Sequence, residues 1–164
     1  GSGEDGGGGI GVRLQGRCVN PGRAEGEALV SRGPLSFYGG VDPKTGVVIE
    51  RGHELEGKCV KGKVLVFPHG KGSTVGSYVI YALKSNGVAP AAIVNGETET
   101  IVATGVILAD IPCVDRVDVG LIRTGDWVVV DADRGIVLVG ERGGCEEAGG
   151  RPEGEKGAAR EGGG

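Results

Sequence analysis

One stretch decides the fold class of this 164-residue chain, namely Lys63-Val64-Leu65-Val66-Phe67-Pro68-His69-Gly70-Lys71-Gly72-Ser73-Thr74-Val75-Gly76-Ser77. Its first five residues are almost continuously apolar, which is typical of a strand covered on both faces of a sheet. The Pro and Gly residues of 68–72 predict a loop. From Thr74 to Lys84 apolar residues recur at helical spacing, and Gly87 follows as a helix C-cap glycine would. The stretch therefore predicts a strand, a glycine-rich loop and a helix.

Strand patterns lie on both sides of this centre. A second buried strand is expected at 91–94, and a further short helix at 98–109. The other expected strands are 12–19 with a Gly break, 25–31, 47–49, 111–114, and a hairpin made of 127–130 and 136–139. The sequence thus predicts an α/β domain of β/β/α layers, with a parallel strand–loop–helix–strand unit inside.

The two ends of the chain differ from its centre in composition. Many of the 36 glycines lie at the ends, mixed with charged residues. Neither end holds enough apolar surface to offset the entropy of ordering, so 1–9 and 141–164 are expected to be disordered. The predicted folded domain is 10–140, a size that fits one domain.

Composition also bears on the class of partner. The net charge is −4, and no basic stripe alternates with aromatic residues, so no nucleic-acid partner is expected. No apolar run approaches the roughly 18 residues of a membrane span, so no membrane partner is expected. The first residues lack the basic and apolar regions of a signal peptide, and the predicted location is cytoplasmic.

Four cysteines stand at positions 18, 59, 113 and 145. No two of them have the C-x-x-C spacing that gathers ligands for zinc or an iron–sulfur cluster, so no metal site is expected on this chain. Free cysteine behaves as a small buried hydrophobe, and Cys18, Cys59 and Cys113 are expected to be reduced packing residues. Cys145 is expected to be exposed in the glycine-rich tail.

The loop before the helix is the main candidate for chemistry. Crevices at the carboxyl ends of parallel strands are where α/β sheets bind ligands, and helix N-termini offer N–H groups to anions. Two interpretations of Ser73, expected at or next to the helix N-cap, remain open at this point. Ser73 or Thr74 caps the helix, or Ser73 acts as a base whose negative charge is stabilised by backbone N–H groups.

Three better-known motifs do not fit the same loop. A phosphate-binding P-loop needs Ser or Thr straight after its Lys, but Gly72 follows Lys71. A dinucleotide fingerprint fails because the glycine spacing has an extra residue and Asn95 ends the next strand. A Ser-His-Asp triad has no support, because nothing in the sequence shows that His69 faces Ser73.

Several stretches together are similar to the small subunit, or swivel domain, of the aconitase X family. The similarity runs through nearly all of 12–138, and the match at 35–46 is far more specific than a lone glycine-rich loop. The matching stretches are 20–30 (NPGRAEGEALV), 35–46 (LSFYGGVDPKTG), 62–68 (GKVLVFP), 70–77 (GKGSTVGS) and 89–94 (APAAIV).

The resemblance implies a swivelling β/β/α domain, as in the aconitase small domain. It implies a large aconitase-like subunit as partner, and places the iron–sulfur cluster there, with no cofactor bound by this chain alone. The implied reaction is dehydration of a phosphorylated hydroxy acid, with (R)-mevalonate 5-phosphate giving trans-anhydromevalonate 5-phosphate in an archaeal-type mevalonate pathway. The partner's cluster iron would bind the departing hydroxyl as a Lewis acid.

The resemblance also implies roles for single residues. Ser73 corresponds to the family's catalytic serine, as proton acceptor, and Lys71, Gly72 and Thr74 are expected to bind substrate. The family often has Arg in place of Lys71 and a second Ser in place of Thr74, and both changes keep the chemical type. No Arg follows Ser73 closely, as one does in aconitases proper, so other groups must bind the substrate anion.

A second candidate lining of the site is 36–42, through Gly39, Gly40 and Asp42. Adjacent glycines permit a close backbone approach to a ligand, whereas the alternative is a plain turn at 42–46. His53 and His69 are expected to be surface or packing residues. Tyr78 and Tyr81 are expected to lie in the helix core or at a subunit contact.

Other functions remain open. One alternative is a dehydratase subunit for another hydroxy acid such as hydroxyproline. Another is a non-catalytic swivel or phosphate-binding module in which Ser73 is a helix cap. A phosphocarrier role for His69 is disfavoured, because the loop resembles the serine family's and not a phosphohistidine segment.

Overall fold

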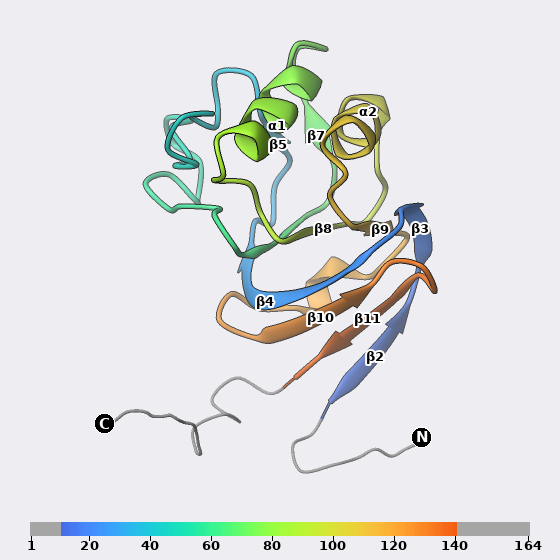
Figure 1. Ribbon diagram of the computed structural model, residues 1–164. Helices are drawn as coiled ribbons and strands as arrows, with labels where there is room; N and C mark the ends of the chain where they lie inside the picture. Colours follow the sequence, from blue (N-terminus) through green and yellow to red (C-terminus); the bar gives the residue numbers. More distant parts are fainter. Residues whose placement is uncertain (1–10, 141–164) are drawn as a thin grey trace, which may run out of the picture.

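The computed structural model describes residues 11–140, which fold around one large sheet (Figure 1). The two expected tails lie outside the described residues, as do Ile10 and Cys145. Neither helix within 11–140 is long and apolar enough to cross a membrane.

The sheet has eight strands, with parallel strands at its centre and antiparallel ones around them. β4, β6, β8 and β9 run parallel, and every other pairing is antiparallel. In spatial order the strands are β2 (Val12–Gln15), β11 (Ile136–Val139), β10 (Trp127–Asp131), β4 (Arg23–Val30), β6 (Val64–Phe67), β8 (Ala92–Asn95), β9 (Cys113–Asp115) and β3 (Arg17–Asn20). The expected parallel centre and the hairpin at 127–139 are both confirmed.

Strand β6 explains the layers. All four of its residues are buried, as the continuous apolar run predicted. Leu65 and Phe67 point into a core shared with the helices, whereas Val64 and Val66 point into a second core shared with the β10–β11 hairpin. Side chains of a strand alternate between its faces, so the sheet is covered on one side by helices and on the other by its own curled edge (Figure 1).

The helices α1 (Gly76–Ser85) and α2 (Thr100–Ala109) pack against each other over one face of the sheet. Their contact is close at Gly105, where a Cβ atom would lie 2.5 Å from Ile80 Cδ1. Gly87 follows the C-cap of α1 with a φ of +74°, which confirms the expected C-cap glycine. The N-cap of α2 is Glu99, whose carboxylate accepts hydrogen bonds from the N–H groups of Ile101 and Val102.

One expected strand is absent and two unexpected ones are present. Residues 47–49 form only single bridges, between Val41 and Val48 and between Val47 and Cys59, because each residue pairs with a different turn. The strands β5 (Leu35–Ser36) and β7 (Gly70–Lys71) pair in parallel as a separate two-stranded sheet. Two-residue strands are too short to show any periodicity in a sequence.

The cysteine expectation is partly wrong. All three cysteines of the described residues are free, and Cys113 is buried, as expected. Burial raises the pKa of the Cys113 thiol to about 12. Cys18 and Cys59 are exposed, because one lies on the edge strand β3 and the other in a turn-rich segment, so these two are not packing residues.

Candidate active site on the Ser73 loop

The Ser73 loop, defined here as residues 68–75, connects β6 to α1 and is held between β5 and the start of α2. Within it, β7 pairs with β5 so that Gly70 lies opposite Leu35 and Lys71 opposite Ser36. Glycine is needed at position 70, because a Cβ atom there would lie 2.5 Å from Glu99 Oε1. The pairing brings together the two segments that the sequence marked as candidate linings.

Ser73 is exposed, and its hydroxyl oxygen accepts a hydrogen bond of 3.1 Å from the Val75 N–H group. The N-cap of α1 is Val75 and makes no side-chain capping hydrogen bond. One interpretation was that Ser73 caps the helix. Instead, the Ser73 side chain closes a short turn just before the N-cap. Its oxygen faces solvent with one backbone N–H group already directed at it.

Some backbone N–H groups near Ser73 have hydrogen-bond acceptors within the chain, and others do not. The first N–H groups of α1 are taken up by the turn, with Gly76 donating to the Ser73 carbonyl and Ser77 to the Thr74 carbonyl. Within residues 11–140, the N–H groups of Ser73 and Thr74 have no hydrogen-bond partner. The donors open to a ligand therefore lie in the loop itself and not in the first turn of the helix.

Gly72 is fixed in place by its own backbone and by Ser36. Its φ is +91°, a left-handed conformation that side-chain-bearing residues rarely adopt. A Cβ atom at Gly72 would lie 2.6 Å from Ser36 Oγ, and that hydroxyl donates to the Tyr38 carbonyl at 3.1 Å. The loop thus rests on Ser36 just before it reaches Ser73.

Lys71 forms an ion pair with Glu50, with 3.0 Å between Nζ and Oε2. The other oxygen of Glu50 accepts the Ser36 N–H group at 3.4 Å. Burial by itself would raise the pKa of Glu50, but the Lys71 and Ser36 hydrogen bonds outweigh it, so the pKa is lowered. Glu50 is therefore a carboxylate at neutral pH, and it joins β5 to β7.

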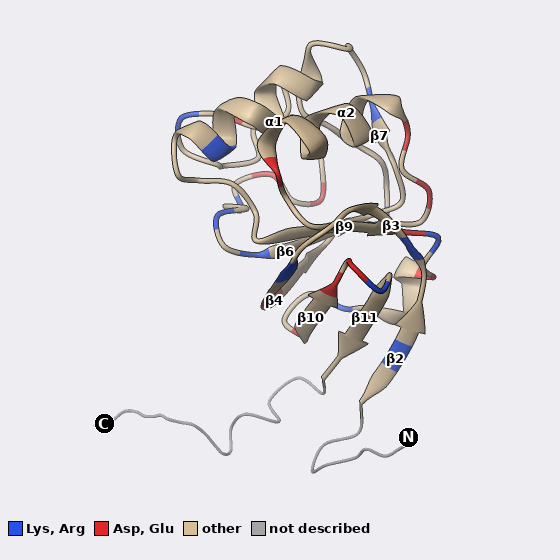
Figure 2. Cartoon of the chain, turned by 45° about the vertical axis from the view of Figure 1, so that its right-hand side comes forward, with Lys and Arg blue, Asp and Glu red and all other residues tan. Residues whose placement is uncertain are grey.

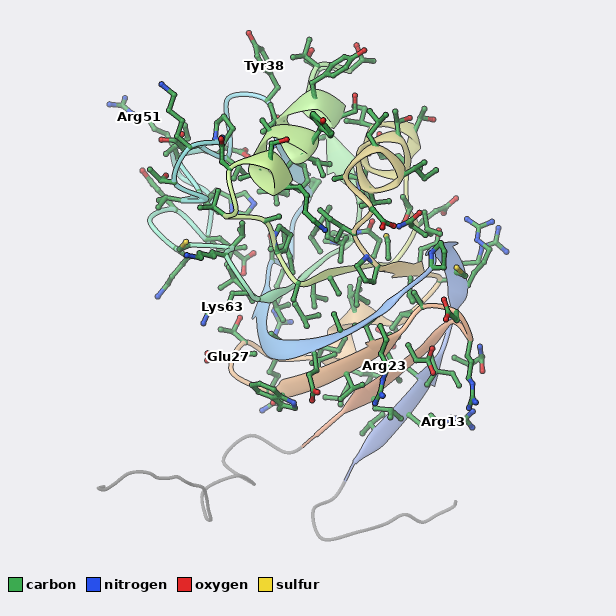
Figure 3. The ribbon with its side chains drawn as sticks, in the orientation of Figure 1. Arg13, Arg23, Glu27, Tyr38, Arg51 and Lys63 are labelled. Atoms are coloured by element: carbon green, nitrogen blue, oxygen red, sulfur yellow. The ribbon has the colours of Figure 1, made fainter. Side chains whose placement is uncertain are left out.

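The two adjacent glycines differ in their surroundings. Gly40 is buried, and a Cβ atom there would overlap the Ser36 carbonyl oxygen and lie 3.2 Å from Glu50 Oε1. Gly39 is exposed, with a φ of +77° and open space where a Cβ atom would be. Tyr38, beside them, points outward at the end of the molecule opposite β2 and β11 (Figure 3). Of these two glycines, Gly39 is the one with an open backbone surface.

Asp42 is not brought to Ser73. Its carboxylate accepts the Lys44 N–H group at 2.9 Å, in the plain turn that was the alternative interpretation. The next residue, Pro43, accepts a 2.7 Å hydrogen bond from Asn86, which caps the C-terminal end of α1. Asp42 thus lies toward the opposite end of α1 from Ser73.

Neither histidine bonds to Ser73. His53 is half-buried, and its Nδ1 accepts the Leu55 N–H group at 3.0 Å, which leaves Nε2 to donate toward the Pro34 carbonyl at 3.2 Å. His69 is exposed, with Nδ1 2.8 Å from the Gly70 carbonyl. His53 Nε2 also lies 3.3 Å from the Oγ of Ser31, a buried serine, so the serine next to a histidine is Ser31 and not Ser73. Both histidines are packing or surface residues.

One residue of this arrangement, Glu50, was missed by sequence reasoning. Glu50 carries no motif, and its partners lie on strands too short to be predicted. Ser36 is the first residue of the second candidate lining, 36–42, although the sequence assigned no contact to it. Among residues 11–140, no group of three or more His, Cys, Asp or Glu side chains is placed to hold a metal ion.

Comparison with known proteins assigns this chain to one family. The family model described as "Aconitase X swivel domain" matches residues 13–139. The phosphomevalonate dehydratase small subunit of Thermococcus kodakarensis is 60% identical over 132 residues, covering 80% of this chain and 99% of the relative. The protein of that name from Methanosarcina acetivorans is 57% identical over 129 residues, covering 77% of this chain and 90% of the relative.

Solved structures agree. The crystal structure of Thermococcus kodakaraensis aconitase X in its holo-form has 60% sequence identity and a TM-score of 0.78, covering 79% of this chain and 99% of that one. A solution NMR structure of a UPF0107 protein has 52% identity and a TM-score of 0.73, covering 79% of this chain and all of that one. With the family match spanning most of its length, this chain belongs to the aconitase X swivel-domain family.

Proposed function

We propose that this chain is the small subunit of a phosphomevalonate dehydratase, which removes water from (R)-mevalonate 5-phosphate to give trans-anhydromevalonate 5-phosphate. The observation that carries the proposal is the 60% identity to small subunits of that name over almost their whole length. The chain acts only together with a large subunit, as the name of those relatives implies.

Ser73 is the proton acceptor in this proposal. Its oxygen takes the proton from the carbon next to the substrate carboxylate, the electron pair of that C–H bond forms the double bond, and the hydroxyl leaves the neighbouring carbon. The exposure of Ser73 and the Val75 N–H group directed at its oxygen support the role. A backbone donor stabilises negative charge on the oxygen, as donors do in an oxyanion hole.

The neighbouring residues bind the substrate anion. The N–H groups of Ser73 and Thr74 and the ammonium of Lys71 provide donors and positive charge beside the proposed base. Gly72 and Gly40 shape the loop, and the open backbone at Gly39 allows a ligand to approach closely. A phosphorylated hydroxy acid carries several negative charges, which suits a site of backbone donors and one Lys.

The iron–sulfur cluster belongs to the large subunit in this proposal. Residues 11–140 do not supply a set of ligands for it. A cluster held by the partner would supply a Lewis acid for the departing hydroxyl, and this chain would supply the base and the anion-binding groups. The two halves of the site would therefore meet only in the assembled enzyme.

The test is Ser73→Ala in a complex reconstituted with the large subunit from the same genome. We expect assembly as in the wild type and a fall in kcat of about 10²- to 10⁴-fold, the usual contribution of a general base. Ser85→Ala is the matched control, since Ser85 is an exposed serine at the other end of α1. Turnover by Ser73→Ala close to that of the control would sink the base assignment.

Substrate identity is tested separately. The wild-type complex is given (R)-mevalonate 5-phosphate and hydroxyproline in parallel, and the expected product forms only from the first. Dehydration of hydroxyproline alone would replace the proposed substrate while leaving the role of Ser73 intact. A wild-type complex that assembles with its cluster but dehydrates neither would favour a non-catalytic swivel or phosphate-binding module.

A further inference from the structure

We propose that Glu50 is a positioning residue of this site, which fixes Lys71 and the Ser73 loop through one carboxylate. The inference rests on the proposed function, because it concerns how that site is held. It adds a residue that no motif in the sequence marks.

Glu50 is in contact with both candidate linings of the site. One carboxylate oxygen lies 3.0 Å from Lys71 Nζ on β7, and the other accepts the Ser36 N–H group on β5. The Glu50 N–H group donates to the Gly40 carbonyl at 3.2 Å. A single residue thus connects the first lining, through Lys71, with the second, through Ser36 and Gly40.

The residues around Glu50 are closely packed. Gly40 lies against both the Ser36 carbonyl and the Glu50 carboxylate, so no larger residue fits there without a shift. Gly72 in turn lies against the Ser36 hydroxyl, and Ser73 follows it directly. A displacement of the Glu50 carboxylate would therefore be passed through Ser36 and Lys71 to the residue proposed as base.

The charge of Glu50 gives the inference a direction. Its carboxylate neutralises part of the positive charge that Lys71 presents to an anionic substrate. Removing that negative charge leaves the attraction of an anionic substrate to Lys71 equal or stronger. Loss of position, however, should lower kcat, because small misplacements of reacting groups are costly. An effect on kcat without a rise in KM is therefore the signature of positioning.

The alternative is an ordinary surface ion pair, which contributes little to stability or function. The chain offers a matched control for it in Lys63 and Glu27, whose Nζ and Oε1 are 2.9 Å apart. These two side chains point toward each other far from Tyr38 and its end of the molecule (Figure 3). Glu27→Gln thus removes an equivalent charge at a remote site.

The experiment compares Glu50→Gln, Glu50→Asp and Glu27→Gln in the reconstituted complex with (R)-mevalonate 5-phosphate. We expect kcat to fall about tenfold or more in Glu50→Gln, with KM unchanged or lower, and to be unaffected in Glu27→Gln. Glu50→Asp keeps the charge but shortens its reach, and we expect an intermediate kcat. Wild-type kcat in both Glu50 variants would overturn the inference.

A charge reversal separates position from simple pairing. The double variant Glu50→Lys with Lys71→Glu restores an ion pair between position 50 and β7 but leaves an acid on the loop. We expect it to regain thermal stability relative to Glu50→Lys alone, without regaining turnover. Recovered turnover would show that any ion pair suffices, and would overturn the assignment.

Hydrogen exchange gives a readout besides activity. In the isolated chain, we expect the N–H groups of Val75 and Gly76 to exchange faster in Glu50→Gln than in the wild type or Glu27→Gln. Unchanged exchange together with unchanged kcat would sink the inference. An active wild-type complex that is inactive with Ser73→Ala but normal with Glu50→Gln would overturn this inference alone and leave the proposed function standing.

Discussion

The backbone of Gly72 lies directly against the hydroxyl of Ser36. The space between them is too small for a methyl group, since a Cβ atom at position 72 would come within 2.6 Å of Ser36 Oγ and 3.4 Å of Ser36 Cβ. Two separate requirements therefore fall on this glycine, one from its left-handed φ of +91° and one from its neighbour. The two can be separated by mutation.

We expect Gly72→Ala to reduce turnover of the reconstituted enzyme at least tenfold, because both the strained φ and the contact with Ser36 displace Ser73. The double variant Gly72→Ala with Ser36→Ala removes the contact but keeps the strain of about 1–2 kcal/mol. It should therefore recover part of the lost turnover. Equal turnover in the single and double variants would mean that the contact with Ser36 has no effect. Steady-state kinetics on the assembled complex make the measurement.

The outer side of α1 is predicted to contact the large subunit. Tyr78 and Tyr81 are 66% and 50% exposed, so they do not lie in the helix core, and Val75 beside the Ser73 loop is 43% exposed. These residues are three apart and share one side of a helix. The two helices together carry a single charged residue, Lys84 (Figure 2). An aromatic, nearly uncharged side beside the site fits a subunit contact.

Tyr78→Ala with Tyr81→Ala should weaken assembly by about 2 kcal/mol or more, as buried aromatic anchors do at interfaces. Leu138→Ala is the control, because Leu138 is 41% exposed on β11, on the far side of the sheet from α1. Isothermal titration of the large subunit measures both. Unchanged affinity in the double variant would exclude this side of α1 as a contact.

Asp115 is predicted to make stability depend on acid pH. Its buried carboxylate accepts two hydrogen bonds from Arg17, at 3.0 and 2.8 Å, and one from the Thr98 N–H group. Burial would raise the pKa of Asp115, but the Arg17 and Thr98 hydrogen bonds outweigh it and the pKa is lowered. A lowered folded-state pKa stabilises the fold above about pH 4, and the contribution is lost as pH falls through the folded value.

Asp115→Asn should therefore lower the free energy of unfolding by about 1–3 kcal/mol at pH 7. The difference from the wild type should shrink as pH falls below about 4, because the carboxylate of the unfolded chain then takes up its proton and that of the folded chain follows at lower pH. Urea unfolding at a series of pH values measures it, with Glu27→Gln as a surface control. A difference independent of pH would contradict the assignment.

Cys113 is predicted to be unreactive in the folded chain. Its side chain is fully buried, and burial raises its pKa to about 12, so almost no thiolate forms at pH 8. Cys18 and Cys59 are exposed and should react with iodoacetamide first. Peptide mass spectrometry should find Cys113 modified only after denaturant is added. Modification of native Cys113 at the rate of Cys59 would show that the core opens readily.

The centre of the fold was predictable because its signals are local. The apolar run of β6 and the glycine after α1 each fit one kind of element only. Residues 47–49 are equally apolar, yet they form no strand, because Val48 bridges to Val41 and Val47 to Cys59. The short run does not even ensure burial, since Val48 is buried but Ile49 is 49% exposed. A strand needs a continuous partner, which the local sequence does not reveal.

The candidate site was predictable only in part, for a related reason. Ser73 and its glycines stand in a contiguous motif, so a resemblance marks them together. Glu50 meets Ser36 and Lys71 only because β5 and β7 pair, and neither short strand has a pattern of its own. The contacts that hold a loop in place therefore escape a sequence even when the loop itself does not.

The pairing of β2 with β11 has a practical consequence. These strands hold the first and last described residues side by side, with Val12 opposite Val139, at the end of the fold away from β5 and β7 (Figure 1). Residues 11–140 can therefore be inserted into a loop of a host protein, because the two connection points are adjacent and the sheet need not be distorted. A reporter protein or surface attachment joined there would leave Ser73 exposed.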